Sequence, residues 1–232
     1  MSAYRQSPFA NLTPVVKNLL IINLICFIPF VILSDDAYQR LIVENLGVFY
    51  FNAPKFRAWQ IITYMFLHGG WTHILFNMFA LFSFGPILEY AIGPKRFLNL
   101  YFICGIGAIL FQWLVQAYEV HAITGGITIP FHFGPDDLSV PLKIREIYHV
   151  PLVGASGAIF GVLVAFAMLY PNLELMIMFI PVPIKAKYII PVYIIIEIFL
   201  GVGQFGGDNV AHFAHLGGAL LGFILVKFWR LR

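Results

Sequence analysis

Long apolar runs, separated by short polar segments, dominate the sequence. A helix that crosses a bilayer needs about 20 mostly apolar residues, with a usual range of about 17–25. Six runs meet this condition, and they cover residues 18–34, 73–92, 97–118, 151–170, 187–204 and 210–229. The stretch 175–184 is also apolar, but it is short and contains Pro181 and Pro183. It therefore predicts an interfacial or re-entrant segment that leads into the fifth span.

Two of the predicted connections are long. Residues 35–72 contain Pro54 and several aromatic side chains, and they are too apolar for a solvated loop and too broken for a span. We expect this segment to lie in the interface, with its rings at the depth of the lipid headgroups. Residues 120–150 mix glycine, proline and charged residues, and they predict a surface loop.

Composition narrows the class of protein further. The chain is 60% hydrophobic and only 11% charged, whereas soluble domains are about 25% charged. This argues against a soluble enzyme, and a net charge of +3 without a basic cluster argues against a nucleic-acid binder. Cys26 and Cys104 both lie in apolar runs, so we expect neither a disulfide framework nor a cysteine zinc site. The prediction is one polytopic membrane domain over residues 1–232.

The placement of lysine and arginine predicts the orientation, because cytoplasmic loops are enriched in both. With the N-terminus inside, nine of the fourteen basic residues fall on the inner side: Arg5, Lys17, Lys95, Arg96, Lys185, Lys187, Lys227, Arg230 and Arg232. We therefore expect a multi-pass protein of the plasma or inner membrane with both termini in the cytoplasm.

Polar residues inside a membrane are costly and mark candidate functional sites. One cluster near the start of the second span contains His68, His73 and Asn77. If the helix begins near Trp71, His73 and Asn77 share one face and can donate hydrogen bonds toward one point. The alternative is a pair of interfacial residues that satisfy backbone groups at the helix start.

A second cluster lies at the beginning of the fourth span. Ser156 is surrounded by small residues, and Gly157 and Gly161 form a stripe that allows another helix to approach closely. Taken alone, this pattern also fits a packing motif in which the serine bonds back to its own helix.

A third cluster lies in the sixth span. His215 precedes Gly218 by three residues on the same helix face, and Gly222 completes a second glycine stripe. Two helices with matching stripes can pack with their backbones nearly touching. Ser156 and His215 would then face each other near the outer membrane surface, where a neutral imidazole can accept the serine proton.

Three acidic residues are candidates to complete a triad or to act as proton relays. Glu89 can relay protons or anchor neighbouring backbone donors, and we favour the structural role. Asp208 lies in the loop before the sixth span, and Glu197 lies in the middle of the fifth span, deeper than the expected site. The sequence therefore predicts a Ser–His dyad, with Phe160 packing against the imidazole in place of a carboxylate.

Attack by Ser156 on a carbonyl also requires hydrogen-bond donors for the developing oxyanion. The side chains of His73 and Asn77 and the backbone N–H of Ser156 are suitable. These motifs, in this order and on these spans, resemble the rhomboid family of intramembrane serine proteases over nearly the whole chain. The resemblance rests on His68…His73-x-x-x-Asn77, Gly85-x-x-x-Glu89-x-x-x-Gly93, Gly154-Ala155-Ser156-Gly157 and His215-x-x-Gly218-x-x-x-Gly222.

The resemblance implies an all-α membrane protein, a bundle of six transmembrane helices with a partly membrane-embedded first loop. Ser156 would be the nucleophile and His215 the general base. The oxyanion hole would comprise the side chains of His73 and Asn77 with the backbone N–H groups of Ser156 and Ala155. Substrates would be single-span membrane proteins in the lipid bilayer, cut near the outer end of their helix, without cofactor, metal or nucleic acid. Where many members have Trp-Arg in the first loop, this chain has Trp59-Gln60.

Three alternatives remain at this point. One is an inactive relative that binds transmembrane clients, although such relatives typically lack the serine or the histidine and this chain keeps both. Another is a small channel or transporter, which would tolerate Ser156→Ala but lose activity through Glu89 or Glu197. The last is a metal site built from His68, His73, His212 and His215. The HExxH motif that is typical of metalloproteases does not occur in the sequence.

Overall fold

The computed structural model describes residues 12–33, 36–129, 134, 137–177, 180–203 and 211–231. Arg5, Asp208 and Arg232, on which parts of the sequence analysis rest, lie outside these residues. The described helices are α1 (Pro14–Ile32), α2 (Asp36–Leu46), α3 (Gln60–Thr63), η2 (Tyr64–Phe66, a 3-10 helix), α4 (Trp71–Ile92), α5 (Pro94–Thr124), α6 (Leu142–His149), α7 (Ser156–Leu169), α8 (Ala186–Gly203) and α9 (His212–Phe228). Strands β1 (Glu174–Ile177) and β2 (Ile180–Lys185) complete the described elements.

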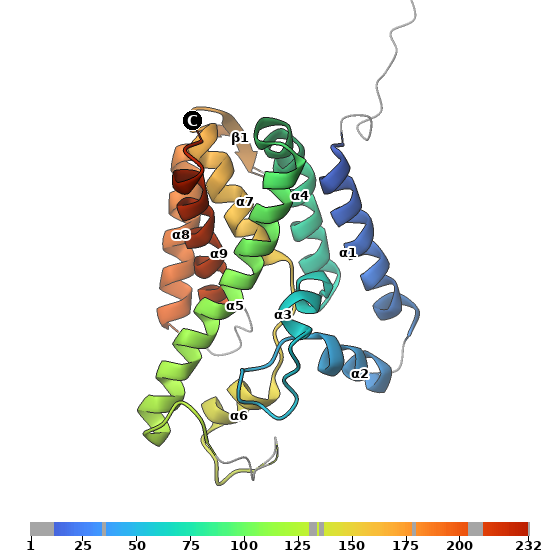
Figure 1. Ribbon diagram of the computed structural model, residues 1–232, viewed down its shortest axis with the longest axis vertical. Coiled ribbons are helices and arrows are strands. Elements are labelled where there is room, and N and C mark those ends of the chain that lie inside the picture. The colour runs from blue at the N-terminus through green and yellow to red at the C-terminus, as the bar shows by residue number, and fades with distance from the viewer. Residues whose placement is uncertain are drawn as a thin grey trace, which may run out of the picture.

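The long helices stand side by side, and α7 lies among them (Figure 1). α7 packs against α4, α5, α8 and α9, while α1 packs against α4 at one edge of the bundle. The short helices α2, α3 and α6 gather at one end of the molecule, whereas the start of α1, strand β1 and the end of α9 lie at the opposite end (Figure 1). The buried centre is therefore formed mainly by α7 and the helices that surround it.

Among the described residues, four helices are long and apolar enough to cross a membrane, namely α1, α4, α5 and α8, and α7 and α9 are shorter apolar helices. The fourth span was predicted from residue 151, but α7 begins only at Ser156. Pro151 and Gly154, whose φ is +135°, keep the preceding segment out of a helix. With 14 residues, α7 rises about 21 Å, which is less than the roughly 30 Å of a hydrocarbon core. Ser156 therefore starts a helix that is too short to fill that thickness.

The two glycine stripes meet, as the sequence predicted. A Cβ atom added at Gly218 of α9 would lie only 2.7 Å from the carbonyl carbon of Gly157 and closer still to its oxygen. One turn further along, a Cβ at Gly222 would lie 2.7 Å from the Cα of Gly161. Backbone contact between α7 and α9 is possible only because these positions have no side chains.

Glu89 has the structural role that we favoured. Its carboxylate lies near the end of α4 and accepts hydrogen bonds from the backbone N–H groups of Val15 and Val16, at 3.1 and 2.8 Å, and from the hydroxyl of Thr13. These groups belong to the start of α1, where backbone N–H groups have no partner within the helix. A side chain 74 residues away in sequence thus caps the first helix.

Two predicted connections contain regular secondary structure. The stretch 175–184, expected to be interfacial or re-entrant, contributes to a two-stranded antiparallel hairpin of β1 and β2. A two-stranded hairpin has edges on both strands, so it tolerates Pro181 and Pro183, which a helix interior would not. The surface loop predicted over 120–150 is partly helical, because α5 continues to Thr124 and α6 forms from Leu142.

The first loop is held by its own polar groups. Gln60 is fully buried, and its amide nitrogen donates to the carbonyl oxygens of Glu44 and Lys55, each at 3.1 Å. Its side-chain oxygen accepts from the backbone N–H of Arg57 at 2.9 Å. A neutral amide therefore ties the first loop together.

Candidate active site

The local backbone sets the position of Ser156 at the start of α7. The N–H of Gly154 donates to the carbonyl oxygen of Tyr64 at 2.9 Å, which anchors the approach to the helix. The φ of +135° at Gly154 turns the chain, and Ala155, which is fully buried, precedes the first helical residue. The first backbone N–H groups of a helix have no acceptor within it, so those near Ser156 point out of the helix end.

His215 lies one turn inside α9 and faces the serine. Its Nε2 atom is 2.7 Å from Ser156 Oγ, although the two residues are 59 positions apart. The serine therefore bonds to the imidazole, and the packing-only interpretation of its motif does not describe the structure. The distance depends on the glycine contact between α7 and α9, which brings the two helix backbones together.

Phe160 packs on the imidazole as predicted. Its ring stacks on His215 with a centroid separation of 4.4 Å and an angle of 9° between the planes. Tyr193 of α8 packs against Phe160, with 5.0 Å between the ring centroids. The stacking fixes the plane of the imidazole.

The prediction that Glu197 lies deeper than the site is wrong. Glu197 Oε2 is 2.8 Å from His215 Nδ1 and 2.7 Å from His212 Nδ1, and all three side chains are buried. The sequence predicted the wrong depth for Glu197 because the depth of a residue in the membrane depends on where its helix and the neighbouring helices begin. α9 begins only at His212, so its first turn lies level with Glu197 of α8. The sequence did contain a signal for this contact. Glu197 is a lone carboxylate in an apolar span, and such a group needs a polar partner inside the protein.

His73 lies beside Gly154 and Ser156. Its Nδ1 accepts a hydrogen bond from the N–H of Gly69 at 3.4 Å, so a neutral ring carries its proton on Nε2. A Cβ atom added at Gly154 would lie 2.7 Å from His73 Nε2 and 3.6 Å from Ser156 Oγ. The missing side chain of Gly154 thus leaves room between a ring N–H donor and the hydroxyl.

Asn77 follows His73 by one turn of α4, which begins at Trp71 as predicted. The side chain is 6% exposed, and its Nδ2 atom donates to no protein atom among the described residues. An unsatisfied buried amide costs free energy, so this donor is available to a ligand oxygen.

The four histidines of the alternative metal site fall into two pairs. Within the described part of the chain, the group with a geometry suited to a metal ion consists of Glu197, His212 and His215. His68 does not join it, because its ring packs edge-on against His73 at 5.0 Å. His68 lies in the loop before α4 and is fully buried, and this burial, together with the nearby His73, lowers its pKa to about 3.

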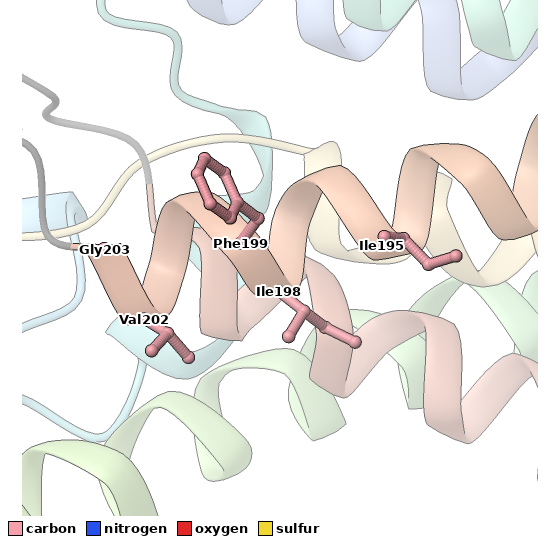
Figure 2. A pocket seen from close by; sticks show the side chains of 5 residues that line it. All are labelled: Ile195, Ile198, Phe199, Val202 and Gly203. Atoms are coloured by element: carbon pink, nitrogen blue, oxygen red, sulfur yellow. The ribbon is translucent and has the colours of Figure 1, made fainter.

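α8 also presents an apolar hollow. The hollow has a volume of about 390 Å³ and is lined by residues of α8 alone (Figure 2): Ile195, Ile198, Phe199, Val202 and Gly203. Its lining includes neither Ser156 nor His215 and has no charged group. The hollow is therefore separate from the polar cluster and contributes no chemical group to it.

Comparison with known proteins identifies the family of the chain. The family model of the Rhomboid domain matches residues 55–231, and the chain belongs to the rhomboid family. The resemblance found in the sequence motifs is thus confirmed. Together with the apolar helices, this membership makes the chain an integral membrane protein.

The chain is similar to several curated rhomboid proteins. It is 29% identical to a putative rhomboid protease, YdcA, of Bacillus subtilis, over 94% of this chain and 92% of that protein. It is 32% identical to the rhomboid protease AarA of Providencia stuartii, over 72% of this chain and 54% of that protein. The mitochondrial RHOMBOID-like protein 12 of Arabidopsis thaliana is 28% identical over 90% of this chain and 56% of its own length. The chain thus spans about half the length of several relatives.

Proposed function

We propose that the protein is an intramembrane serine endopeptidase that uses Ser156 as nucleophile and His215 as general base. The observation that carries the proposal is the 2.7 Å hydrogen bond between Ser156 Oγ and His215 Nε2 at the start of α7. Membership of a family that includes named proteases supports it. The reaction is hydrolysis of a peptide bond within a transmembrane segment of another protein.

The first half of the reaction forms an acyl-enzyme. His215 Nε2 takes the proton of Ser156 as Oγ bonds to the substrate carbonyl carbon. The imidazolium then gives this proton to the leaving amide nitrogen, the C–N bond breaks, and the C-terminal fragment departs as an amine. In the second half, water attacks the ester with His215 again as base, and the acid product leaves as the Ser156 hydroxyl re-forms.

The oxyanion of both tetrahedral intermediates needs preorganised donors. We assign this role to His73 Nε2–H, the Asn77 amide, and the backbone N–H groups of Ser156 and Ala155. The unpaired Nδ2 of Asn77 and the space left by Gly154 beside His73 support the assignment. The helix dipole of α7 adds positive potential at the same point.

We further propose six membrane crossings within a single domain, with α7 and α9 as the short ones. The basic residues Lys17, Lys95, Lys185 and Lys227 lie in or beside the ends of elements that gather at one end of the bundle (Figure 1). By the enrichment of basic residues in cytoplasmic loops, this end faces the cytoplasm and both termini lie there. Ser156, at the opposite end of α7, then lies below the outer surface, where water can reach it.

The test is cleavage of a tagged single-span substrate by detergent-purified protein. We expect Ser156→Ala and His215→Ala each to abolish cleavage, and the melting temperature of Ser156→Ala to stay close to that of the wild type. Cleavage by Ser156→Ala at the wild-type rate would contradict the proposal. It would mean that another group or a contaminating protease cuts the substrate, whereas absence of cleavage by the wild type would favour the channel or client-binding alternatives.

The substrate offers a second test. Helical amides are hydrogen-bonded and shielded, so cleavage requires local unwinding. Substrates with glycine or proline near the cut should therefore be cleaved faster than matched substrates with leucine there. Equal rates would show that unwinding does not limit the reaction.

A further inference from the structure

The Ser156–His215 pair continues into a chain of buried hydrogen bonds. His215 Nδ1 lies 2.8 Å from Glu197 Oε2, and the same oxygen lies 2.7 Å from His212 Nδ1. We infer that Glu197 is a positioning residue that converts the dyad into a Ser–His–Glu arrangement, and that His212 holds its carboxylate in place. This inference rests on the proposed function.

The carboxylate fixes the tautomer of the base. An ionised carboxylate can only accept hydrogen bonds, so His215 Nδ1 must carry a proton to donate to Glu197. In the neutral ring Nε2 then has a free lone pair, and this is the atom that lies 2.7 Å from Ser156 Oγ. Phe160, stacked at 4.4 Å, fixes the ring plane but cannot choose between the tautomers.

The carboxylate also opposes the charge that forms during the reaction. When His215 accepts the serine proton, the ring becomes a buried cation 9% exposed to solvent. Such a charge is costly in an apolar interior unless a countercharge lies beside it. Glu197 supplies this countercharge and stays ionised throughout, so the proton moves only between Ser156 Oγ, His215 Nε2 and the leaving nitrogen.

His212 explains how the carboxylate is held. Glu197 is only 4% exposed, so its carboxylate needs a hydrogen-bond donor besides His215 to remain satisfied while His215 takes part in the reaction. The His212 ring, perpendicular to that of His215, supplies a second N–H from the first turn of α9. Since both histidines belong to α9, one rigid helix sets the distance from each ring to Glu197.

The pH dependence of the reaction provides a readout that a purely structural role would not change. Besides Glu197 and His212, the groups that face His215 are Ser156 of α7, His73 of α4 and Tyr193 of α8, which lies near Glu197. Removing the carboxylate makes the imidazole harder to protonate. The base then stays neutral to lower pH, so the acid limb of kcat/KM against pH moves to lower pH.

The experiment compares Glu197→Gln, Glu197→Asp and a matched control, Glu89→Gln. Glu89 is another buried carboxylate, but it caps α1 and touches no residue of the proposed site. We expect Glu197→Gln to lower kcat at least about 10²-fold, since an amide favours the wrong tautomer, with KM within about 3-fold of the wild type. Its acid limb should move to lower pH, because the countercharge to the imidazolium is gone.

The variants Glu197→Asp and Glu89→Gln test whether the effect depends on the negative charge at residue 197. Glu197→Asp keeps the charge and should retain at least about a tenth of the wild-type kcat, a partial rescue relative to glutamine. Glu89→Gln should lower the melting temperature and leave kcat and the pH profile unchanged. Full activity of Glu197→Gln, or an equal loss in the glutamine and aspartate variants with an unmoved acid limb, would overturn the inference.

His212 is tested by a double-mutant cycle. If His212 acts only through Glu197, His212→Leu lowers kcat in the wild type but adds little to the loss in Glu197→Gln. Equal losses in both backgrounds would show that His212 acts independently.

A metal is the rival explanation of this cluster. Wild-type protein treated with EDTA should keep its full activity, whereas activity lost on EDTA treatment and restored by zinc would overturn the positioning role.

If Ser156→Ala cleaves as fast as the wild type, the proposed function itself fails. If Ser156→Ala is inactive while Glu197→Gln is fully active, only the present inference fails.

Discussion

Gly218 offers a direct test of how helix packing creates the site. The substitution Gly218→Ala adds one methyl group where α9 touches α7. This Cβ would lie 2.7 Å from the carbonyl carbon and 3.2 Å from the Cα of Gly157, with the carbonyl oxygen closer still. The obstacle is helix backbone, which cannot rotate away as a side chain can, so the two helices must separate.

The size of the separation follows from contact distances. Carbon atoms in contact lie about 3.5–4.0 Å apart, so α9 must move away by about 1 Å. His215 is one turn from Gly218 and moves with it, so the 2.7 Å bond to Ser156 stretches beyond hydrogen-bonding range. A 1 Å misplacement of a reacting group costs about 10²-fold in rate, and overpacking destabilises by about 1–3 kcal/mol.

The assay is cleavage of a tagged single-span substrate in detergent, with the melting temperature measured in parallel. We expect Gly218→Ala to lose about 10²-fold in kcat and to melt at a lower temperature. Gly70→Ala is the matched control, because nothing lies within 4 Å of a Cβ added there. Wild-type activity and stability of Gly218→Ala would refute the view that backbone contact sets the Ser–His distance.

Three further predictions follow from single side chains. Asn77→Ala should lower kcat by about 10²–10³-fold, the scale of one oxyanion donor, with little change in the melting temperature. Glu89→Gln should destabilise the fold by about 1 kcal/mol through loss of the α1 cap, measured by unfolding in detergent. In the folded protein the His68 ring stays neutral down to a pH of about 3, whereas in the unfolded chain it takes up a proton once the pH falls below its ordinary pKa of 6.5. Stability should therefore fall as pH drops from about 6.5 toward 3, by about 2 kcal/mol at pH 5, and His68→Phe should reduce this slope.

The local sequence pattern was sufficient to predict several features of the structure. The apolar runs located the long helices, because a membrane-facing helix must be apolar around its circumference. The spacing of glycines predicted the contact of α7 with α9, and the stacking of Phe160 on His215 followed from one helical turn. These features depend on neighbours three or four residues apart, a distance that a helix fixes by its geometry.

The sequence alone gave wrong or incomplete answers where three dimensions decide. The start of α7 at Ser156 depends on Gly154 and on its hydrogen bond to Tyr64, which lies 90 residues earlier. The sequence did not predict that residues 174–185 form the hairpin of β1 and β2, whose strands satisfy each other's backbone groups.

Glu197 shows most clearly what each level contributes. The sequence by itself determined that this chain is a membrane protein, that it carries a serine and a histidine beside matching glycine stripes, and that a carboxylate lies in the fifth apolar run. Only the tertiary structure decided that this carboxylate meets His212 and His215, since the relative depth of two helices depends on where each begins. The apolar composition of a helix decides that it is stable in lipid, whereas the packing of helices decides which of their side chains lie at the same depth in the membrane.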